Sequence, residues 1–146
     1  MIDDTDRALV ALLARNSRIS LKDLAVGIGL SSPSASERLR RLEERGVIRG
    51  YTVEVEPRLL GLDVQAIVRI SPFPGRLAQV QKLIEAASEI VECDKVTGED
   101  CFVVRLFVRS MEHLNEVVGP LADEATTNTL LVKSQVIRRR LPPMTP

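Results

Sequence analysis

The sequence predicts an α+β protein with an N-terminal winged helix-turn-helix domain and a C-terminal ferredoxin-like domain of the order βαββαβ. Apolar residues recur at helical spacing in three stretches before Gly46, and β-branched residues alternate along several later stretches. A segment that contains Pro57 and Gly61 separates the helical pattern from the strand pattern. We therefore expect a first domain at residues 1–57, a linker at residues 58–62 and a second domain at residues 63–146.

Capping residues mark the first two helices. The first is expected within residues 1–15, with Asp3 as its N-terminal cap and Asp6 near the positive end of the helix dipole. The second begins after Ser20 and carries apolar residues at positions i, i+3, i+4 and i+7. It should stop before Gly29, because glycine commonly follows the last helical residue.

The third helix is predicted to start at Pro33, with Ser32 as its N-terminal cap. A turn of about three residues connects it to the second helix, which is the spacing of a helix-turn-helix. The second helix of that motif lies in the DNA major groove. The β-branched residues 47–55 then predict a strand or wing after this helix.

The outward face of the third helix is polar, because its apolar side chains Ala35, Leu39 and Leu42 all point inward. Arginine can meet guanine or phosphate, glutamate can accept from cytosine, and serine can meet either. The predicted DNA-binding residues are Ser32, Ser34, Ser36, Glu37, Arg38, Arg40, Arg41, Arg45 and Arg49. A plain amphipathic hairpin is the alternative, since the pairs Glu37/Arg41 and Arg40/Glu44 have the i, i+4 spacing of solvated helices.

Composition restricts the function classes. The chain has 20 Lys and Arg against 20 Asp and Glu, and this zero net charge weighs against binding to DNA by non-specific attraction alone. Residues 31–50 are locally basic, with five arginines and three glutamates. Only 3% of the residues are aromatic, so base stacking is not expected to dominate recognition.

The reactive residue types indicate neither an enzyme nor a metal protein. Cys93 and Cys101 form no disulfide framework, and we expect both to be buried and reduced. His113 is the single histidine and lies in a polar stretch, which favours a solvated side chain over a catalytic one. No apolar run spans a membrane and the acidic start is unlike a secretion signal, so we expect a cytoplasmic protein. The sequence shows no zinc-ligand spacing and no metal cluster, so we expect no cofactor.

The second domain is predicted as two βαβ-like halves, at residues 64–97 and 101–137. We expect strands at residues 64–70, 90–97, 100–108 and 126–138, and helices at residues 77–87 and 110–118. Helices cover one face of such a sheet, which should leave the other face bare and apolar in a lone subunit. A second copy related by a two-fold axis is the simplest partner, and a palindromic DNA site requires the same symmetry.

Short fragments along nearly the whole chain resemble the Lrp/AsnC family of bacterial and archaeal transcription regulators. In order, they are Ile2–Arg7, Asn16–Ser20, Leu24-Ala25, Leu30-Ser31, Arg38-Leu39, Leu42-Glu43, Gly46–Ile48, Gly50-Tyr51, Leu60-Gly61 and Val96–Asp100. The resemblance implies DNA binding by dimers or larger rings of dimers. It also implies a regulatory domain that binds a small effector, often an amino acid, where dimers meet.

By this resemblance the effector-binding residues are Gly98, Glu99 and Asp100, with Thr127 and Thr129 as further members. Gly98 permits a tight turn whose backbone N–H groups can meet a carboxylate, and Asp100 can bind an ammonium group. The alternative is an ordinary hairpin turn. The chain departs from the family here, with Cys101 where an aromatic residue is common and Glu124-Ala125 where Gly-Val is common.

The sequence therefore predicts a DNA-binding transcriptional regulator that responds to an amino acid or a similar metabolite. Its expected partners are double-stranded DNA, the effector and further copies of itself, as a dimer, tetramer or octamer. Two alternatives share parts of this architecture: a sirohaem-decarboxylase-like enzyme and a stand-alone amino-acid-sensing module. The single histidine argues against the enzyme, and the helix-turn-helix would be unexplained in the sensing module.

Overall fold

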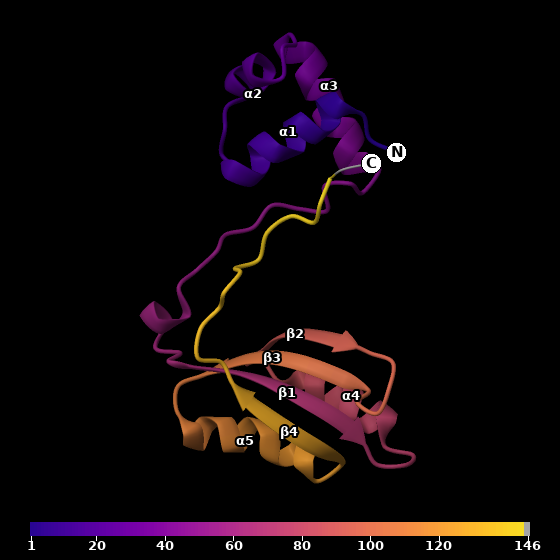
Figure 1. The fold of residues 1–146 in the computed structure, drawn as a ribbon, viewed down its shortest axis with the longest axis vertical. Coiled ribbons are helices and arrows are strands. Elements are labelled where there is room, and N and C mark those ends of the chain that lie inside the picture. The colour runs from indigo at the N-terminus through magenta and orange to yellow at the C-terminus, as the bar shows by residue number, and fades with distance from the viewer. Residues whose placement is uncertain (145–146) are drawn as a thin grey trace. The chain divides into compact units, whose positions relative to one another are not determined.

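The computed structural model describes residues 1–144, and its contacts divide the chain into two compact units. One unit comprises residues 1–54 together with residues 137–144, and the other spans Val55–Val136 (Figure 1). The first unit is helical, and the second contains the whole sheet. Residues 137–144 thus belong to the helical unit, although the sequence grouped them with the second domain.

The helical unit contains α1 (Asp4–Arg15), α2 (Leu21–Gly27) and α3 (Ser32–Glu44). Both predicted caps of α1 and α2 are confirmed, since Asp3 accepts from the Asp6 N–H at 2.8 Å and Ser20 accepts from the Asp23 N–H at 3.0 Å. Each helix contributes one fully buried leucine to a common core, namely Leu9, Leu24 and Leu42. This core fixes which face of α3 remains exposed.

The turn between α2 and α3 differs in detail from the prediction. The α2 helix ends at Gly27, and Gly29 then turns the chain with a φ of +68°. The predicted cap Ser32 is wrong by one residue, because the Ser31 hydroxyl accepts from the Ser34 N–H at 3.4 Å. Ser31 has the extended backbone of a cap, whereas Ser32 is already helical. The connection keeps the short length of a helix-turn-helix.

Residues 47–55 form no strand, so the strand predicted there is wrong. The N–H groups of Val47 and Ile48 instead donate to the Leu42 carbonyl at 2.9 and 3.1 Å, which closes the end of α3. A strand needs a neighbouring backbone to pair with, and β-branched composition alone does not supply one.

The second unit has the predicted βαββαβ order. A 3-10 turn, η1 (Pro57–Leu60), overlaps the predicted linker at residues 58–62 and begins one residue before it. The unit then contains β1 (Val64–Pro72), α4 (Leu77–Ala86), β2 (Ile90–Lys95), β3 (Phe102–Val108), α5 (Met111–Ala122) and β4 (Ala125–Leu131). The strands form one antiparallel sheet in the order β2-β3-β1-β4.

The last strand is shorter than the predicted residues 126–138. Leu131 pairs with Ala66, close to the start of β1, so the chain beyond it soon has no strand beside it. Its continuation makes one more ladder bond, from the Val132 N–H to the Gln65 carbonyl at 2.9 Å. The strand therefore ends because its neighbour β1 begins at Val64, and not because of the residue types beyond Leu131.

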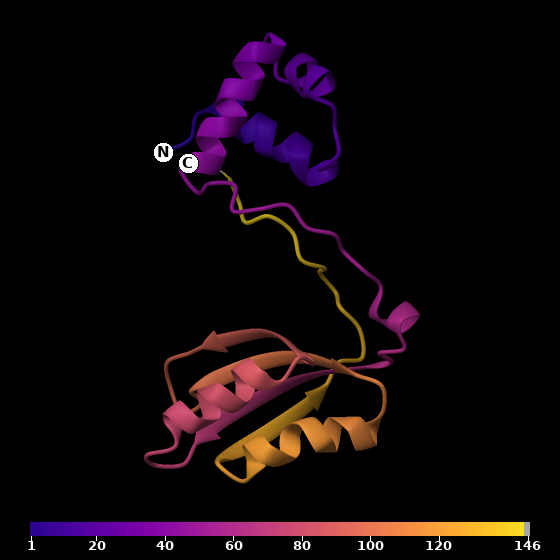
Figure 2. The same cartoon turned by 180° about the vertical axis from the view of Figure 1, so that it is seen from behind.

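Helices α4 and α5 cover one face of the sheet (Figure 2). Alternate residues of β3 are buried against them, from Phe102 to Val108, and this strand lies between β2 and β1 in the interior of the sheet. The core of the unit consists of Ala66, Val68, Ile70, Val80, Ile84, Phe102, Val104, Leu106, Val108, Leu114, Leu121 and Ala125.

The opposite face of the sheet, which we call the open face, is not the uniformly apolar surface that the sequence predicted. The register places Ile67, Val103 and Phe107 on it, but also the charged residues Arg69 and Arg105. Arg105 Nε lies 3.4 Å from a carboxylate oxygen of Glu92 on the neighbouring strand. Cross-strand ion pairs thus interrupt the apolar surface.

Both cysteines are free, and the prediction that Cys93 is buried is wrong. Cys93 lies on β2, which is an edge strand and mostly exposed, whereas Cys101 is half-buried just before β3. Within residues 1–144, no three His, Cys, Asp or Glu side chains gather in a way that could hold a metal ion. No helix in that range has the length and apolar character needed to cross a membrane.

Candidate nucleic-acid interface and ligand turn

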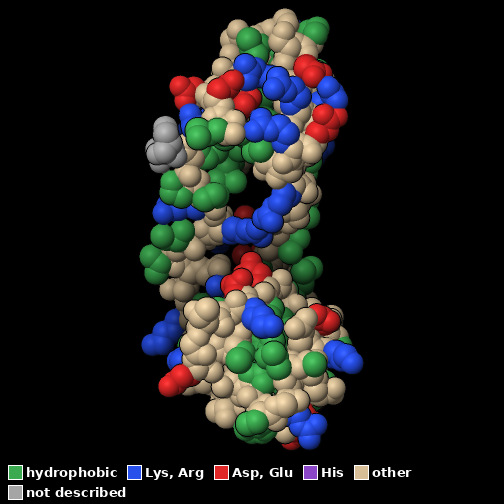
Figure 3. All heavy atoms as spheres, turned by 90° about the vertical axis from the view of Figure 1, so that its right-hand side faces the viewer, with side chains coloured by type: hydrophobic (Ala, Val, Ile, Leu, Met, Phe, Trp, Pro, Cys, Tyr) green, Lys and Arg blue, Asp and Glu red, His purple; other side chains and the backbone are tan. Residues whose placement is uncertain are grey.

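The exposed face of α3 is set by the residues that it buries. Ala35 and Leu42 are fully buried and Leu39 is half-buried, as predicted. Of the predicted DNA-binding residues, one group is exposed, namely Ser34, Ser36, Glu37, Arg40, Arg41, Arg45 and Arg49, while Ser32 is half-buried. Figure 3 shows basic and acidic side chains interspersed over the helical unit. We call Ser34, Ser36, Glu37, Arg40 and Arg41 the reading face.

Arg40 and Arg41 differ in their bonding, although they are adjacent on the reading face. The Arg40 guanidinium bonds to Glu37 at 2.7 Å and also to Glu44. Its bond to Glu37 lowers the pKa of that carboxyl and raises the pKa of Arg40 itself. Arg41 makes no ion pair with any residue in the range 1–144. Glu37 therefore pairs with Arg40, whereas its i, i+4 spacing suggested a pair with Arg41.

Arg38 does not join the reading face. Its guanidinium bonds to Asp3 at 2.7 Å and to Asp6 at 2.8 Å, and so connects α3 to the N-terminal cap of α1. The bond from Arg38 is the main reason that the pKa of Asp3 is lowered. Asp6 is buried, with 7% exposure. The geometry assigns Arg38 to helix packing, since a buried carboxylate needs a paired cation.

Two further contacts fix the surroundings of α3. Arg45 donates to the Met1 carbonyl at 3.3 Å. The Tyr51 hydroxyl donates to Glu43 at 2.7 Å and so ties the segment after α3 back to that helix. Burial and this bond raise the pKa of Tyr51 to about 12. The helical spacing of the sequence does not predict the Tyr51–Glu43 bond, because Glu43 lies in α3 and Tyr51 in the irregular segment after it.

The turn between β2 and β3 is bonded to the end of β1. Gly98 has a φ of +107°, which favours glycine. The Ser71 hydroxyl donates to the Glu99 carbonyl at 2.7 Å, and Arg69 Nη2 lies 2.6 Å from a carboxylate oxygen of Asp100. Both charged side chains reach solvent, with exposures of 48% for Arg69 and 25% for Asp100. A cation and an anion thus lie side by side at this turn.

The single chain does not bring Thr127 and Thr129 to this charge pair. Thr127 pairs with Ile70 and Thr129 with Val68, which places both threonines on the face covered by the helices. Arg69 lies on the open face, where its partner on β4 is Asn128. Strand alternation is the signal that separates these residues, because neighbouring residues of a strand point to opposite faces. Sequence reasoning missed Arg69, Ser71 and Asn128.

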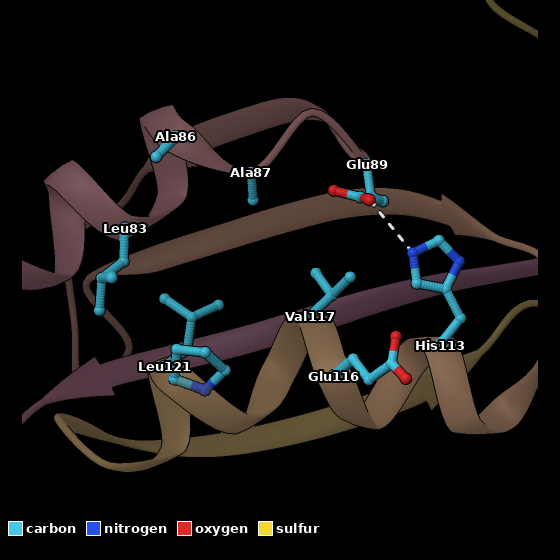
Figure 4. Close-up of a pocket in the computed structure, with 9 residues that line it drawn as sticks. Leu83, Ala86, Ala87, Glu89, His113, Glu116, Val117 and Leu121 are labelled. Atoms are coloured by element: carbon cyan, nitrogen blue, oxygen red, sulfur yellow. Dashed lines mark hydrogen bonds and ion pairs between the residues drawn. The ribbon is translucent and has the colours of Figure 1, made fainter.

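A shallow groove of about 320 Å³ lies between α4 and α5 (Figure 4). Its apolar walls include Leu83, Val117 and Leu121. At one end His113 Nε2 lies 3.1 Å from Glu89, and the Arg109 N–H donates to His113 Nδ1 at 3.3 Å. His113 is therefore bonded and mostly buried, and the expectation of a solvated side chain was wrong. Its role here is to join α5 to the loop before β2.

Comparison with known proteins covers both units. The family described as winged helix-turn-helix DNA-binding matches residues 2–49, and the family described as Lrp/AsnC ligand binding domain matches residues 65–142. The transcriptional regulator LrpA of Mycobacterium tuberculosis is 34% identical over an alignment of 137 residues, and the match covers 91% of this chain and 91% of LrpA. LrpC of Bacillus subtilis is 30% identical over 135 residues, which are 92% of this chain and 94% of LrpC.

Solved structures agree over the same length. The structure of B. subtilis LrpC has a TM-score of 0.89 at 29% identity and covers 95% of this chain and 99% of its own. A feast or famine regulatory protein from M. tuberculosis, complexed with L-methionine, also has a TM-score of 0.89, at 30% identity. That match covers 97% of this chain and 99% of the M. tuberculosis chain.

Proposed function

Because this chain belongs to the Lrp/AsnC family of transcriptional regulators, we propose that its reading face binds the DNA major groove and that an amino acid bound in its second unit alters this binding. One observation carries the first half of the proposal. The core buries Ala35 and Leu42 of α3 and leaves a polar face outward, with Arg41 unpaired among residues 1–144. A free guanidinium on such a helix suits guanine recognition.

The residues of the reading face take different roles in this proposal. Ser34, Ser36 and Glu37 lie in the first turns of α3, and the N-terminal part of a recognition helix contacts base edges. Arg41 lies one turn further and reads a guanine or binds a phosphate. Arg40 must give up its ion pairs with Glu37 and Glu44 before it can bind DNA, so it contributes less net affinity than Arg41. Arg45 and Arg49 follow the helix and suit phosphate contacts.

Two copies of the reading face are needed for a palindromic site. We assign the pairing of subunits to the open face of the sheet, where Ile67, Val103 and Phe107 offer apolar area between charged residues. Four or eight subunits would be built from such dimers. Light scattering on the full chain tests this, and a monomer at micromolar concentration would contradict it.

The Arg69–Asp100 pair carries the ligand proposal. An α-amino acid has an ammonium and a carboxylate on one carbon, so it can bond to Asp100 and Arg69 in place of their bond to each other. The backbone N–H groups near Gly98 offer further donors to the carboxylate. The related M. tuberculosis protein with bound L-methionine supports this ligand class. Thr127 and Thr129 would join only through another subunit, because they lie on the other face.

The proposal is tested in two steps on the full-length protein. Selection of duplexes from a random library by binding to the protein gives a target, called the enriched duplex. The affinity of the protein for this duplex is then measured with and without each amino acid. Calorimetric titration with L-methionine, and then with the other amino acids, gives the ligand affinity directly. We expect tight binding to the enriched duplex and a change in that affinity with one or more amino acids, since a ligand acts by its differential affinity for two states. No enrichment of any duplex would overturn the proposal.

No observation favours the two alternative functions. The relatives are named as transcriptional regulators, and the single histidine is bonded to Glu89 in the groove between α4 and α5. The match over residues 2–49 gives the helical unit a role that a stand-alone sensing module would lack.

A further inference from the structure

Charge is strongly divided between the two units, although the whole chain is neutral. The unit at Val55–Val136 has eight Lys or Arg against twelve Asp or Glu, a net charge of −4. Residues 1–54 have nine against eight, a net charge of only +1. The remaining charge of +3 comes entirely from the chain after Ile137, through Arg138, Arg139 and Arg140. This segment, residues 137–144, is called the basic arm below.

The basic arm belongs to the helical unit by its contacts, and it raises the charge of that unit from +1 to +4. Both views show the chain returning to this unit beside the N-terminus, near the end of α3 (Figures 1 and 2). Arg45 caps that end of α3 and Arg49 follows it. The arm thus adds three arginines to the C-terminal end of α3, where Arg45 and Arg49 already lie.

The three arginines of the arm are available to bind a partner. All three are exposed, and Arg139 and Arg140 form no ion pair within residues 1–144. Arg138 has one, to Glu54 at 4.0 Å, with side-chain exposures of 73% and 78%. An exposed pair of this kind contributes little and is easily replaced. Pro142 and Pro143 follow, which restricts the backbone beyond the arginines to extended conformations.

We propose that Arg138, Arg139 and Arg140 bind DNA phosphates beside the site read by α3, as a second and sequence-independent contact. This rests on α3 being the recognition helix, because its C-terminal end then points toward the DNA backbone. Consecutive arginines in an irregular segment suit phosphates, which are evenly spaced and carry no sequence information. The contact also explains how a chain without net charge can obtain the electrostatic part of DNA affinity.

The test compares three variants of the full chain on the enriched duplex and on a scrambled duplex of equal length. The first is R138Q/R139Q/R140Q, which removes the arm's charge. The second is R138K/R139K/R140K, which keeps it. The matched control is R58Q/R109Q/K133Q, which removes the same charge from exposed positions of the other unit. Circular dichroism and light scattering establish that each variant keeps its fold and assembly.

We expect the glutamine variant to lose affinity for both duplexes by the same factor. The slope of log affinity against log salt should become shallower by roughly 0.9 for each phosphate that the arm no longer neutralises, so by up to about 2.7 per protomer. The lysine variant and the control should behave as the unmodified chain does.

Three results would overturn the proposal: an unchanged affinity and salt slope in the glutamine variant, an equal loss in the control, or a loss confined to the enriched duplex. A failure of the unmodified chain to bind any duplex would instead refute the role given to α3, so the two failures are distinguishable.

Discussion

Replacing Arg41 with alanine tests the reading face most directly. Arg41 is exposed and makes no ion pair within residues 1–144, so its removal leaves no carboxylate without a partner in the free protein. The change should therefore appear almost entirely in the complex with DNA. Removal of one bidentate bond to guanine costs about 1–3 kcal/mol, which corresponds to roughly 5–150-fold weaker binding.

The assay is a gel shift or fluorescence anisotropy titration of the enriched duplex, repeated on duplexes with single base-pair changes. If Arg41 contacts a base, the variant binds the enriched duplex more weakly and loses discrimination at one position of each half-site. If it contacts a phosphate, affinity falls equally on all duplexes and the salt slope decreases by about 0.9 for that phosphate. Arg109→Ala is the control, because Arg109 is an exposed arginine of the other unit.

Arg40→Ala provides the contrast that refutes or supports the reasoning. Arg40 is bonded to Glu37 and Glu44, so its removal exposes two carboxylates to the DNA phosphates. That variant should bind all sequences more weakly, without loss of discrimination at one position. Wild-type affinity of Arg41→Ala on every duplex would remove Arg41 from the interface and refute the distinction between free and paired arginines.

Three further predictions concern the ligand turn, the helical core and the single tyrosine. Asp100→Asn should abolish amino-acid binding in calorimetry and leave DNA affinity unchanged. Loss of the oligomer instead would show that Asp100 supports the structure of the turn and not the ligand. Leu42→Ala should lower the free energy of unfolding in a denaturant titration by about 2–5 kcal/mol, because Leu42 is fully buried; a change below about 1 kcal/mol would contradict the core. The phenol absorbance of Tyr51 should titrate near its pKa of about 12, and Glu43→Gln should lower that pKa, whereas titration at the ordinary value would contradict the Tyr51–Glu43 bond. Since folding raises this pKa, its contribution to stability is present below pH 10 and is lost as the pH rises from about 10 to 12.

Sequence alone determined the features that depend on neighbours within four residues. The caps Asp3 and Ser20 and the inward residues of α3 follow from such spacings, and the structure confirms them. The order of helices and strands follows in the same way, because it is a succession of local periods. The resemblance to the family was also readable, since it rests on short fragments in order.

Tertiary structure decided the features that depend on residues far apart in the chain. Arg38 reaches Asp3 across 35 positions, and Arg69 reaches Asp100 across 31. These contacts took Arg38 away from the reading face and gave Asp100 a cation that the sequence did not suggest. The absent strand at residues 47–55 and the early end of β4 have the same cause, because a strand exists only where another backbone lies beside it. Local spacing specifies each element, and long-range pairing specifies which side chains it leaves free to bind.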